Sequence, residues 1–259
     1  MLSWAVVRSV PASFAQALCA EPPEPPIDVA RARAQHADYV RALAAAGLEV
    51  VAIAADEACP DCCFVEDVAV LLGDAALATC PGAPSRRGEV DPVAAALAKR
   101  LEVIRMAAPA TLDGGDCLRL GRTIYVGRSS RSNREGIAAL AEQAGARGLA
   151  VVPVDMPAGV LHLKSVCSPL GEDTVLVAEG SIPPATFAGA RVLVAPAAQR
   201  HAANAVAVGR IALVAAGAPG TAALVEAAGF SPVPVDTSEL RKADGALTCL
   251  SIVAGAPPG

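Results

Sequence analysis

Short apolar runs alternate with turn residues along most of the chain, and they come in pairs. The two runs of each pair flank a turn that contains glycine, and this arrangement predicts antiparallel hairpins. The paired runs are 65–72 with 75–79, 117–120 with 123–126, 163–167 with 174–178, and 205–208 with 211–214. The last run, 250–253, has no neighbour of this kind, so we expect it to pair with Trp4–Arg8 from the other end of the chain.

Stretches rich in Ala, Leu and Arg separate the hairpins, and their apolar residues recur at helical spacing. The pattern predicts helices over residues 27–46, 92–105, 133–144, 183–188 and 221–228. Each unit of the chain is therefore expected to run strand, turn, strand, helix.

A polar residue near the start of the first strand recurs in every unit. These residues are Glu66, Asp113, His162, Asn204 and Cys249, and successive members are separated by 47, 49, 42 and 45 residues. Repeats of this length are typical of propellers and arrays, and a ring closed by its terminal strands leaves no open sheet edge. An ordinary α/β sheet with coincidental spacing is the alternative. No linker or composition shift divides the chain, so we expect residues 1–259 to form one domain.

The composition argues against nucleic-acid and membrane partners. Lys and Arg number 21 against 26 Asp and Glu, a net charge of −5, and aromatic residues make up 3% of the chain. A net negative surface does not attract polyanions, and few aromatic rings are available to stack on bases. No run of about 18 apolar residues occurs, and Arg8 interrupts the apolar start that a signal peptide would need. We expect a cytoplasmic protein.

Eight cysteines are too few for a disulfide framework in a chain of 259 residues, so most are expected to be reduced thiols. Cys249 differs, because a glycine-bearing loop delivers it to the start of the last strand. A thiol with a histidine elsewhere in the chain is a candidate nucleophile pair. His162 lies between apolar residues at a strand entrance, where a core histidine bonded to a carbonyl is an equal alternative.

Carboxylates stand at two strand entrances among apolar residues and glycines. Glu66 and Asp67 occupy one entrance, and Asp113 and Asp116 occupy the next. Solvated acids usually have charged neighbours, so this setting predicts a concave, partly desolvated acidic site that binds a cation. Paired hydrogen bonds make a planar guanidinium a good ligand for carboxylates.

Several motifs in this order resemble those of the dimethylarginine dimethylaminohydrolases, over nearly the whole chain. They are PDCCFVED (60–67), SRRGE (85–89), LDGGD (112–116), SRSN (130–133), LHLK (161–164), VDTSELRK (235–242) and DGALTC (244–249). The family belongs to the guanidino-group-modifying enzymes. The resemblance implies the pentein fold, a five-bladed α/β propeller of pseudo-repeated ββαβ units, which agrees with the repeat.

The resemblance also implies roles for matching positions. Cys249 would be the nucleophile, His162 the general acid/base, and Asp113 the carboxylate that orients the histidine. The implied substrate-binding residues are Glu66 and Asp67 at the guanidinium, Asp61 and Asp244 along the site, Arg86 and Arg131 at the substrate carboxylate, and Leu18, on a lid loop, with Phe64 at the methylated end. Relatives often have Glu in place of Asp113, a change that retains the charge.

The implied activity is hydrolysis of Nω,Nω-dimethyl-L-arginine, and of its monomethyl analogue, to L-citrulline and the amine. The reaction would pass through a covalent S-alkylthiouronium on Cys249, and it would need neither cofactor nor metal. The partner is then a small guanidino amino acid, and a homodimer stays open.

Other functions remain as alternatives. Arginine and agmatine deiminases are related but longer, and agmatine lacks the carboxylate that Arg86 and Arg131 would bind; both arginines could instead be solvated. Cys59, Cys62, Cys63 and Cys80 could hold structural zinc, although a second pair at the usual spacing is missing. A redox role for Cys59 and Cys62 is disfavoured, because no helix clearly follows. An inactive, zinc-binding family member is the last alternative.

Overall fold

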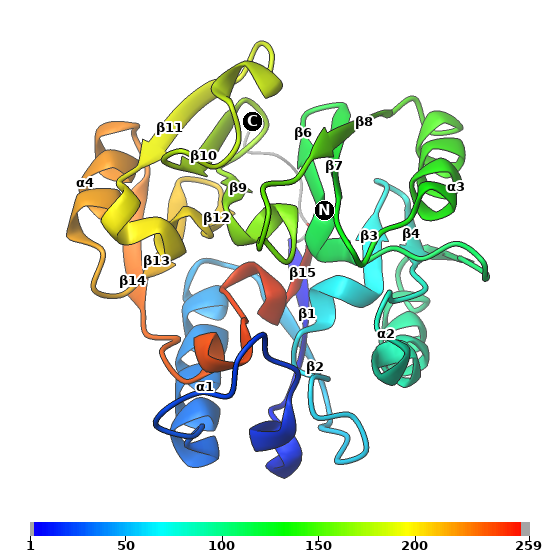
Figure 1. Cartoon of the computed structure of the whole chain (residues 1–259), viewed down its shortest axis with the longest axis horizontal. Helices are drawn as coiled ribbons and strands as arrows, with labels where there is room; N and C mark the ends of the chain where they lie inside the picture. The colour runs from blue at the N-terminus through cyan, green and yellow to red at the C-terminus, as the bar shows by residue number, and fades with distance from the viewer. Residues whose placement is uncertain (1–2, 255–259) are drawn as a thin grey trace.

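Five three-stranded sheets surround a common centre in the computed structural model, which describes residues 3–254 (Figure 1). The sheets have the orders β15-β1-β2, β3-β4-β5, β6-β7-β8, β9-β10-β11 and β12-β13-β14. The strands are β1 (Trp4–Arg8), β2 (Glu49–Ile53), β3 (Ala69–Leu71), β4 (Ala75–Ala78), β5 (Glu102–Arg105), β6 (Cys117–Leu120), β7 (Thr123–Arg128), β8 (Ala150–Asp155), β9 (Cys167–Pro169), β10 (Thr174–Ala178), β11 (Arg191–Ala195), β12 (Val206–Val208), β13 (Ile211–Ala215), β14 (Ser231–Val235) and β15 (Ile252–Ala254).

Every sheet has the same topology. Its middle strand is antiparallel to one neighbour and parallel to the other. In four units an α-helix carries the crossover to the parallel strand, which is the usual connection of this kind, whereas the crossover from β10 to β11 has only a 3-10 turn. These helices are α1 (Val29–Ala45), α2 (Val90–Leu97), α3 (Arg134–Gly145) and α4 (Pro219–Ala227), and they lie on the outside of the ring (Figure 1). The predicted α/β propeller of ββαβ units is confirmed.

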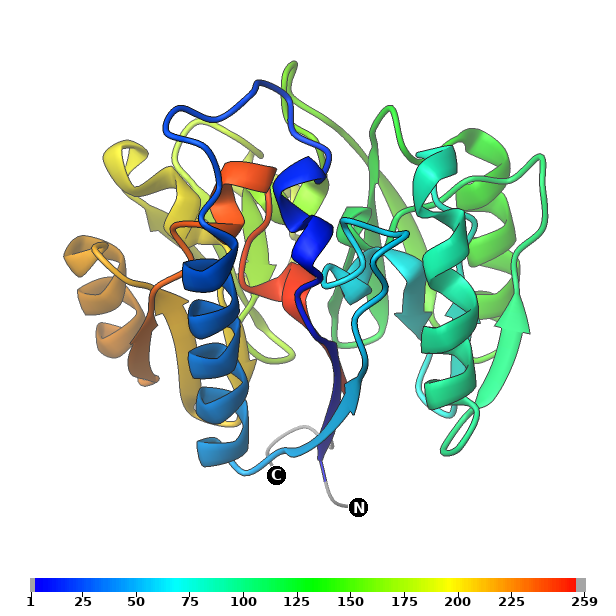
Figure 2. The same ribbon diagram turned by 90° about the horizontal axis from the view of Figure 1, so that it is seen from below.

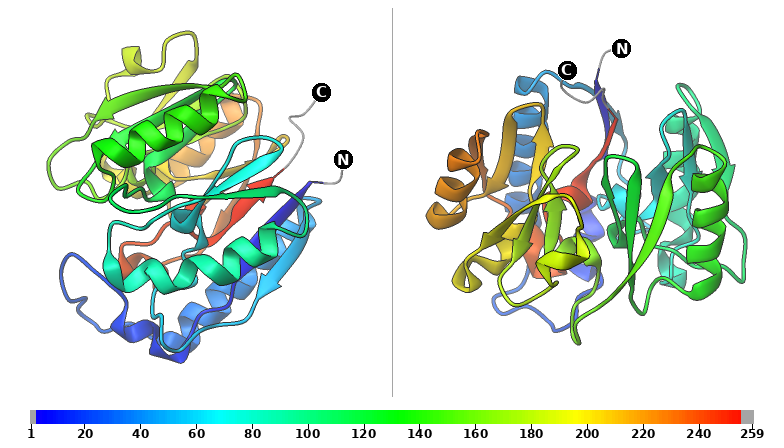
Figure 3. Two further views of the ribbon diagram at one scale, coloured as in Figure 1. Left: turned by 90° about the vertical axis from the view of Figure 1, so that its right-hand side faces the viewer. Right: turned by 90° about the horizontal axis from the view of Figure 1, so that it is seen from above.

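The two ends of the described chain close the ring. β1 pairs antiparallel with β15, with Trp4 opposite Ala254, and it pairs in parallel with β2, with Trp4 opposite Glu49. Figure 3 shows these terminal strands side by side in both views. The predicted pairing of Trp4–Arg8 with the last apolar run is thus correct.

Burial explains the two kinds of apolar run in the sequence. The middle strands β1, β4 and β10 are buried along their whole length. Alternate residues of β1 and of β4 belong to different hydrophobic clusters, so both faces of these strands are covered. Such strands are continuously apolar rather than alternating. The parallel outer strands β2, β5 and β8 are partly exposed. The hydrophobic pattern by itself does not predict these strands. Only the family resemblance predicts a third strand in each unit.

Three predicted strands begin later than expected, because a 3-10 helix stands in front of each. These short helices span Val65–Val68, Leu163–Ser165 and Thr248–Leu250. In all three the backbone turns sharply before the strand, and short apolar runs do not distinguish this turn from an extended start.

Two predicted helices are shorter than expected. The helix predicted over 92–105 is α2, which begins at Val90 and ends at Leu97 before the chain continues into β5. The helix predicted over 183–188 is a single 3-10 turn, Pro184–Thr186. The turn ends at Phe187, whose backbone (φ −98°, ψ 63°) leaves the helical region.

None of the described helices has both the length and the apolar character that a membrane crossing requires.

The contact between α3 and the loop before β6 gives a stability prediction. A Cβ on Gly136 would lie 1.9 Å from the carbonyl oxygen of Thr111, whereas a Cβ on Gly145, in the same helix, would meet nothing within 4 Å. We expect Gly136→Ala to lower the free energy of unfolding by on the order of 2 kcal/mol, because the backbone must shift. Gly145→Ala should raise it by up to about 1 kcal/mol through helix propensity. Urea unfolding of both variants tests this, and equal effects would contradict the tight contact.

Candidate active site

The polar residues of the repeat meet at the centre of the ring, next to a cavity of about 700 Å³. Nine of the residues predicted to form the site line this cavity: Leu18, Asp61, Phe64, Asp67, Arg86, Arg131, His162, Asp244 and Cys249. Glu66 and Asp113 are buried behind its wall. Asp113 contacts His162, which lines the cavity, and Glu66 contacts Thr248, which precedes Cys249. All eleven predicted residues therefore belong to one region of the structure.

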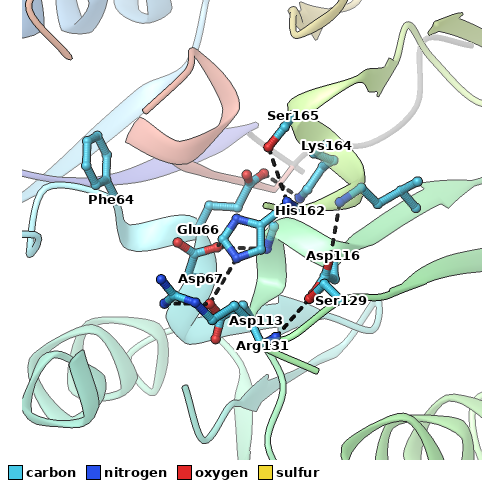
Figure 4. Close-up of polar contacts among 12 residues, drawn as sticks. Phe64, Glu66, Asp67, Asp113, Asp116, Ser129, Arg131, His162, Lys164 and Ser165 are labelled. Atoms are coloured by element: carbon cyan, nitrogen blue, oxygen red, sulfur yellow. Dashed lines mark hydrogen bonds and ion pairs between the residues drawn. The ribbon is translucent and has the colours of Figure 1, made fainter. Parts of the chain in front are cut away.

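The imidazole of His162 lies between two buried carboxylates (Figure 4). Its Nε2 is 3.0 Å from Oδ2 of Asp113, and its Nδ1 is 3.8 Å from Oδ1 of Asp67. Asp113 is itself fixed by the backbone N–H of Gly82, which donates to Oδ1 at 2.8 Å. His162 is thus an oriented, charge-paired group, and the alternative of a core histidine bonded to a carbonyl is wrong.

The carboxylates determine the protonation state of His162. Burial by itself disfavours the imidazolium, but the negative charge of Asp67 and the hydrogen bond with Asp113 outweigh it and raise the pKa of His162 to about 9. Burial would likewise raise the pKa of Asp67, but the charges of His162 and Arg86 lower it to about 2. At neutral pH the pair is therefore imidazolium and carboxylate.

Arg86 holds Asp67 from the other side. Its guanidinium donates to Oδ2 of Asp67, to the carbonyl oxygen of Phe64 at 2.8 Å, and to both carboxylate oxygens of Glu89. Arg86 is 4% exposed, so these bonds replace its hydration. Burial raises the pKa of Glu89 to about 7, even beside this cation. Arg86 therefore reaches the cavity wall with most of its donors already committed to the protein.

Glu66 has a separate cation. Lys164 Nζ donates to Oε1 of Glu66, and the Thr248 hydroxyl donates to Oε2 at 2.6 Å. Burial raises the pKa of Glu66, while Lys164 opposes that rise. Each of the two neighbouring carboxylates thus has its own basic partner, Lys164 for Glu66 and Arg86 for Asp67.

Cys249 is half-buried in the cavity wall, on the 3-10 helix Thr248–Leu250. Burial raises the pKa of its thiol above the ordinary value, and the charges of Glu66 and Asp67 raise it further. Without a bound cation, the side chain is therefore a thiol at neutral pH rather than a thiolate.

Segments from both ends of the chain form the mouth of the cavity. The loop that follows the 3-10 helix Ala12–Gln16 lies beside the segment before Cys249 (Figure 2). The backbone N–H of Leu18 donates to Asp61 at 3.0 Å, and that of Ala20 donates to Asp244 at 2.6 Å. Leu18 is 41% exposed. Because two site carboxylates hold this loop through its backbone, the loop is part of the site.

Arg131 comes from the loop after β7 and also lines the cavity. Its Nη1 is 3.8 Å from Oδ2 of Asp113, and its side chain is 20% exposed. Unlike Arg86, it is within reach of solvent in the cavity, and it therefore presents a positive charge there.

Asp67, Asp113 and His162 offer oxygen and nitrogen atoms within 4.8 Å of one another, a group that could hold a metal ion. The same atoms make the His162–Asp113 bond, so a metal and the imidazolium proton would compete. Over residues 3–254 this is the single such group, and Cys59, Cys62, Cys63 and Cys80 form none. The alternative of a structural zinc site built by these cysteines is therefore not supported.

The sequence did not reveal the partners of several polar residues of the site. Asp116 accepts from the hydroxyls of Ser129 and Ser132 and from the N–H of Leu163, and so joins the histidine loop to the neighbouring unit. Lys164 lies in the motif LHLK (161–164), and Asn204 is one of the five polar residues of the repeat. The signal for both was a polar residue next to an apolar strand start, but it does not reveal the partner.

Comparisons with known proteins agree with this geometry. Residues 23–208 match the family model "N,N dimethylarginine dimethylhydrolase, eukaryotic". The chain is 40% identical to an N(G),N(G)-dimethylarginine dimethylaminohydrolase of Streptomyces coelicolor, over 96% of this chain and 95% of the relative. It is 34% identical to the enzyme of that name from Pseudomonas aeruginosa, over 87% and 89%. The chain belongs to the dimethylarginine dimethylaminohydrolase family.

Solved structures of this family have the same fold. The Pseudomonas aeruginosa dimethylarginine dimethylaminohydrolase, solved as a mutant complexed with citrulline, has a TM-score of 0.92 at 30% identity, covering 98% of this chain and all of that one. The N-terminal domain of ArgZ, a cyanobacterial arginine dihydrolase, has a TM-score of 0.87 at 17% identity, covering 97% of both chains. The second likeness shows the shared fold alone.

The histidine environments predict a wide separation of pKa values. His36, buried in α1 without charged neighbours that raise it, has its pKa lowered by burial to about 4, whereas that of His162 is about 9. In NMR titrations we expect His162 to stay cationic at neutral pH, and Asp113→Asn to lower its pKa by about 1–3. His36 serves as the internal control in the same spectra. A His162 pKa near 6.5 in the unchanged protein would contradict the carboxylate pairing.

Proposed function

We propose that this protein hydrolyses Nω,Nω-dimethyl-L-arginine, and the monomethyl analogue, to L-citrulline and dimethylamine or methylamine. The observation that carries the proposal is the arrangement of Cys249, His162 and Asp67 around one cavity, in a chain whose relatives at 34–40% identity bear the dimethylarginine dimethylaminohydrolase name. Asp67 and Glu66 supply the negative charge for a guanidinium, and Cys249 supplies a nucleophile.

The substrate cation activates the thiol in this proposal. A guanidinium about 4 Å from the sulfur attracts a thiolate by about 4 kcal/mol at an effective dielectric of 20, which lowers the thiol pKa by about 3. The pKa of the unliganded Cys249 is raised by burial and by the site carboxylates. Binding therefore releases the thiol proton to water and produces the nucleophile only where the substrate is present.

His162 then serves both halves of the reaction. The sulfur attacks the central guanidinium carbon, and the His162 imidazolium gives its proton to the departing amine as the carbon–nitrogen bond breaks. A covalent S-alkylthiouronium remains on Cys249. The neutral imidazole takes a proton from water, the oxygen attacks the same carbon, and the carbon–sulfur bond breaks to release citrulline. A histidine pKa of about 9 suits the first half, because the proton is already in place at neutral pH.

Charge and exposure support roles at the two ends of the substrate. Arg131 and Arg86 face the amino-acid carboxylate, and Arg131 bears more of that contact because Arg86 is committed to Asp67 and Glu89. Leu18 and Phe64 give apolar surface for the methyl groups, with the Leu18 loop as a lid. Asp61 and Asp244 hold that loop and complete the lining.

The first test is citrulline formation by the purified protein, with a chelator present. We expect product from dimethylarginine and monomethylarginine, and none or far less from arginine and agmatine. Agmatine has no carboxylate for Arg131, and arginine has no methyl groups for Leu18 and Phe64. Product from arginine alone would instead support the deiminase alternative, and no product from any substrate would contradict the proposed activity.

The second test replaces the nucleophile. Cys249→Ser should lower kcat to background while the protein still binds dimethylarginine in a calorimetric titration, because the oxygen is a poor nucleophile but the carboxylates remain. The matched control is Cys80→Ser, a half-buried cysteine outside the central cavity, which should leave kcat unchanged. Turnover by the Cys249→Ser variant at the rate of the unchanged protein would overturn the assignment.

A further inference from the structure

Four polar side chains beside the cavity form a closed ring of hydrogen bonds. Lys164 Nζ donates to Glu66, whose other carboxylate oxygen accepts from the Thr248 hydroxyl at 2.6 Å. The Asn204 amide donates to the same hydroxyl oxygen at 2.9 Å and to the backbone carbonyl of Lys164 at 2.8 Å. The Thr248 backbone N–H donates to Oδ1 of Asn204 at 2.9 Å, which joins the two residues a second time.

The chemistry of the donors and acceptors fixes the direction of each hydrogen bond in this ring. Asn204 Nδ2 can only donate, so the Thr248 hydroxyl accepts from it and donates its own proton to Glu66. Both amide hydrogens of Asn204 and both oxygens of Glu66 are then used. Asn204 is 1% exposed and Thr248 is 7% exposed. A buried network of this kind is rigid when it is fully satisfied and costly when one member is lost.

The ring joins four of the five units. Glu66 precedes β3, Lys164 precedes β9, Asn204 precedes β12 and Thr248 precedes β15. Thr248 is also the neighbour of Cys249 on the same 3-10 helix. Both the backbone N–H and the side chain of Thr248 are held by the ring, so the position of the next residue follows from it.

We propose that Lys164, Glu66, Thr248 and Asn204 act together as a positioning device that fixes the Cys249 sulfur for attack. Thr248 links the ring to the nucleophile through the chain, and for the reaction itself this inference rests on the proposed function. Lys164 adds a second effect. It balances the charge of Glu66 beside the thiol and lowers the pKa of Cys249, against the effect of the carboxylates.

The structure offers matched variants to test this device. Thr248→Val keeps the shape of the side chain but removes the hydroxyl that links Glu66 to Asn204, and Asn204→Leu removes all three bonds of the amide. Thr248→Ser retains the hydroxyl and is the rescue variant. Thr221→Val is the control, because Thr221 is a buried threonine in α4 whose hydroxyl bonds Gln199 at 3.0 Å, away from the ring.

A positioning role predicts a specific kinetic pattern with dimethylarginine. Thr248→Val and Asn204→Leu should each lower kcat by about tenfold or more and change KM by less than about threefold, because the bonds matter to the reacting sulfur and not to substrate binding. Thr248→Ser and Thr221→Val should stay near the unchanged protein. The double variant Thr248→Val/Asn204→Leu should lose no more than the worse single variant, since the ring acts as a unit.

A second measurement separates this inference from the proposed function. Hydrogen exchange of the peptide that contains residues 244–252 should accelerate in Asn204→Leu and stay unchanged in Thr221→Val. If the unchanged protein makes citrulline but the ring variants match Thr221→Val, the positioning device is refuted and the activity stands. If the protein makes no citrulline, faster exchange in Asn204→Leu still supports the ring's hold on the Cys249 segment, and unchanged exchange overturns it.

Discussion

The charged side chains at the centre of this protein are buried, and each depends on an opposite charge from elsewhere in the chain. Glu66 is neutralised by Lys164 from 98 residues further along the chain, Asp67 by Arg86, and Asp113 by His162. An unpaired carboxylate in such a place would take up a proton or destabilise the fold. The propeller satisfies this constraint because it brings the start of one strand from every sheet to the same axis.

The pairing also produces the chemistry that the site can perform. Asp67 acts on both groups, because its charge helps to keep His162 protonated and Cys249 a thiol; Asp113 adds to the first effect and Glu66 to the second. The unliganded site therefore has an acid but no strong nucleophile. A bound guanidinium lowers the pKa of the Cys249 thiol and leaves His162 protonated. Reactivity is thereby tied to the presence of a cation, and this limits the reaction of the thiol with other electrophiles at neutral pH.

Much of this site could be predicted from the sequence, for identifiable reasons. Cys249, His162 and the acidic residues stood at strand starts with a regular spacing, and the motifs around them carried the family. The contacts of Arg86 and Lys164 could not be predicted, because both are long side chains whose partners lie elsewhere in the chain. Arg86 was expected at a substrate carboxylate, and the structure shows it bonded to Asp67, Glu89 and the Phe64 carbonyl.

The sequence by itself determined the five-fold repeat, the closure by the terminal strands and the residue types of the site, because these depend on local periodicity and spacing. It could not separate the 3-10 turns from strand starts, since a short apolar run fits both. Only the tertiary structure decided which charges pair. Burial and distance set each pKa, and both depend on how the units pack together. The ring of hydrogen bonds beside Cys249 belongs to this second class, because Asn204 and Thr248 are 44 residues apart in the chain and adjacent only at the axis.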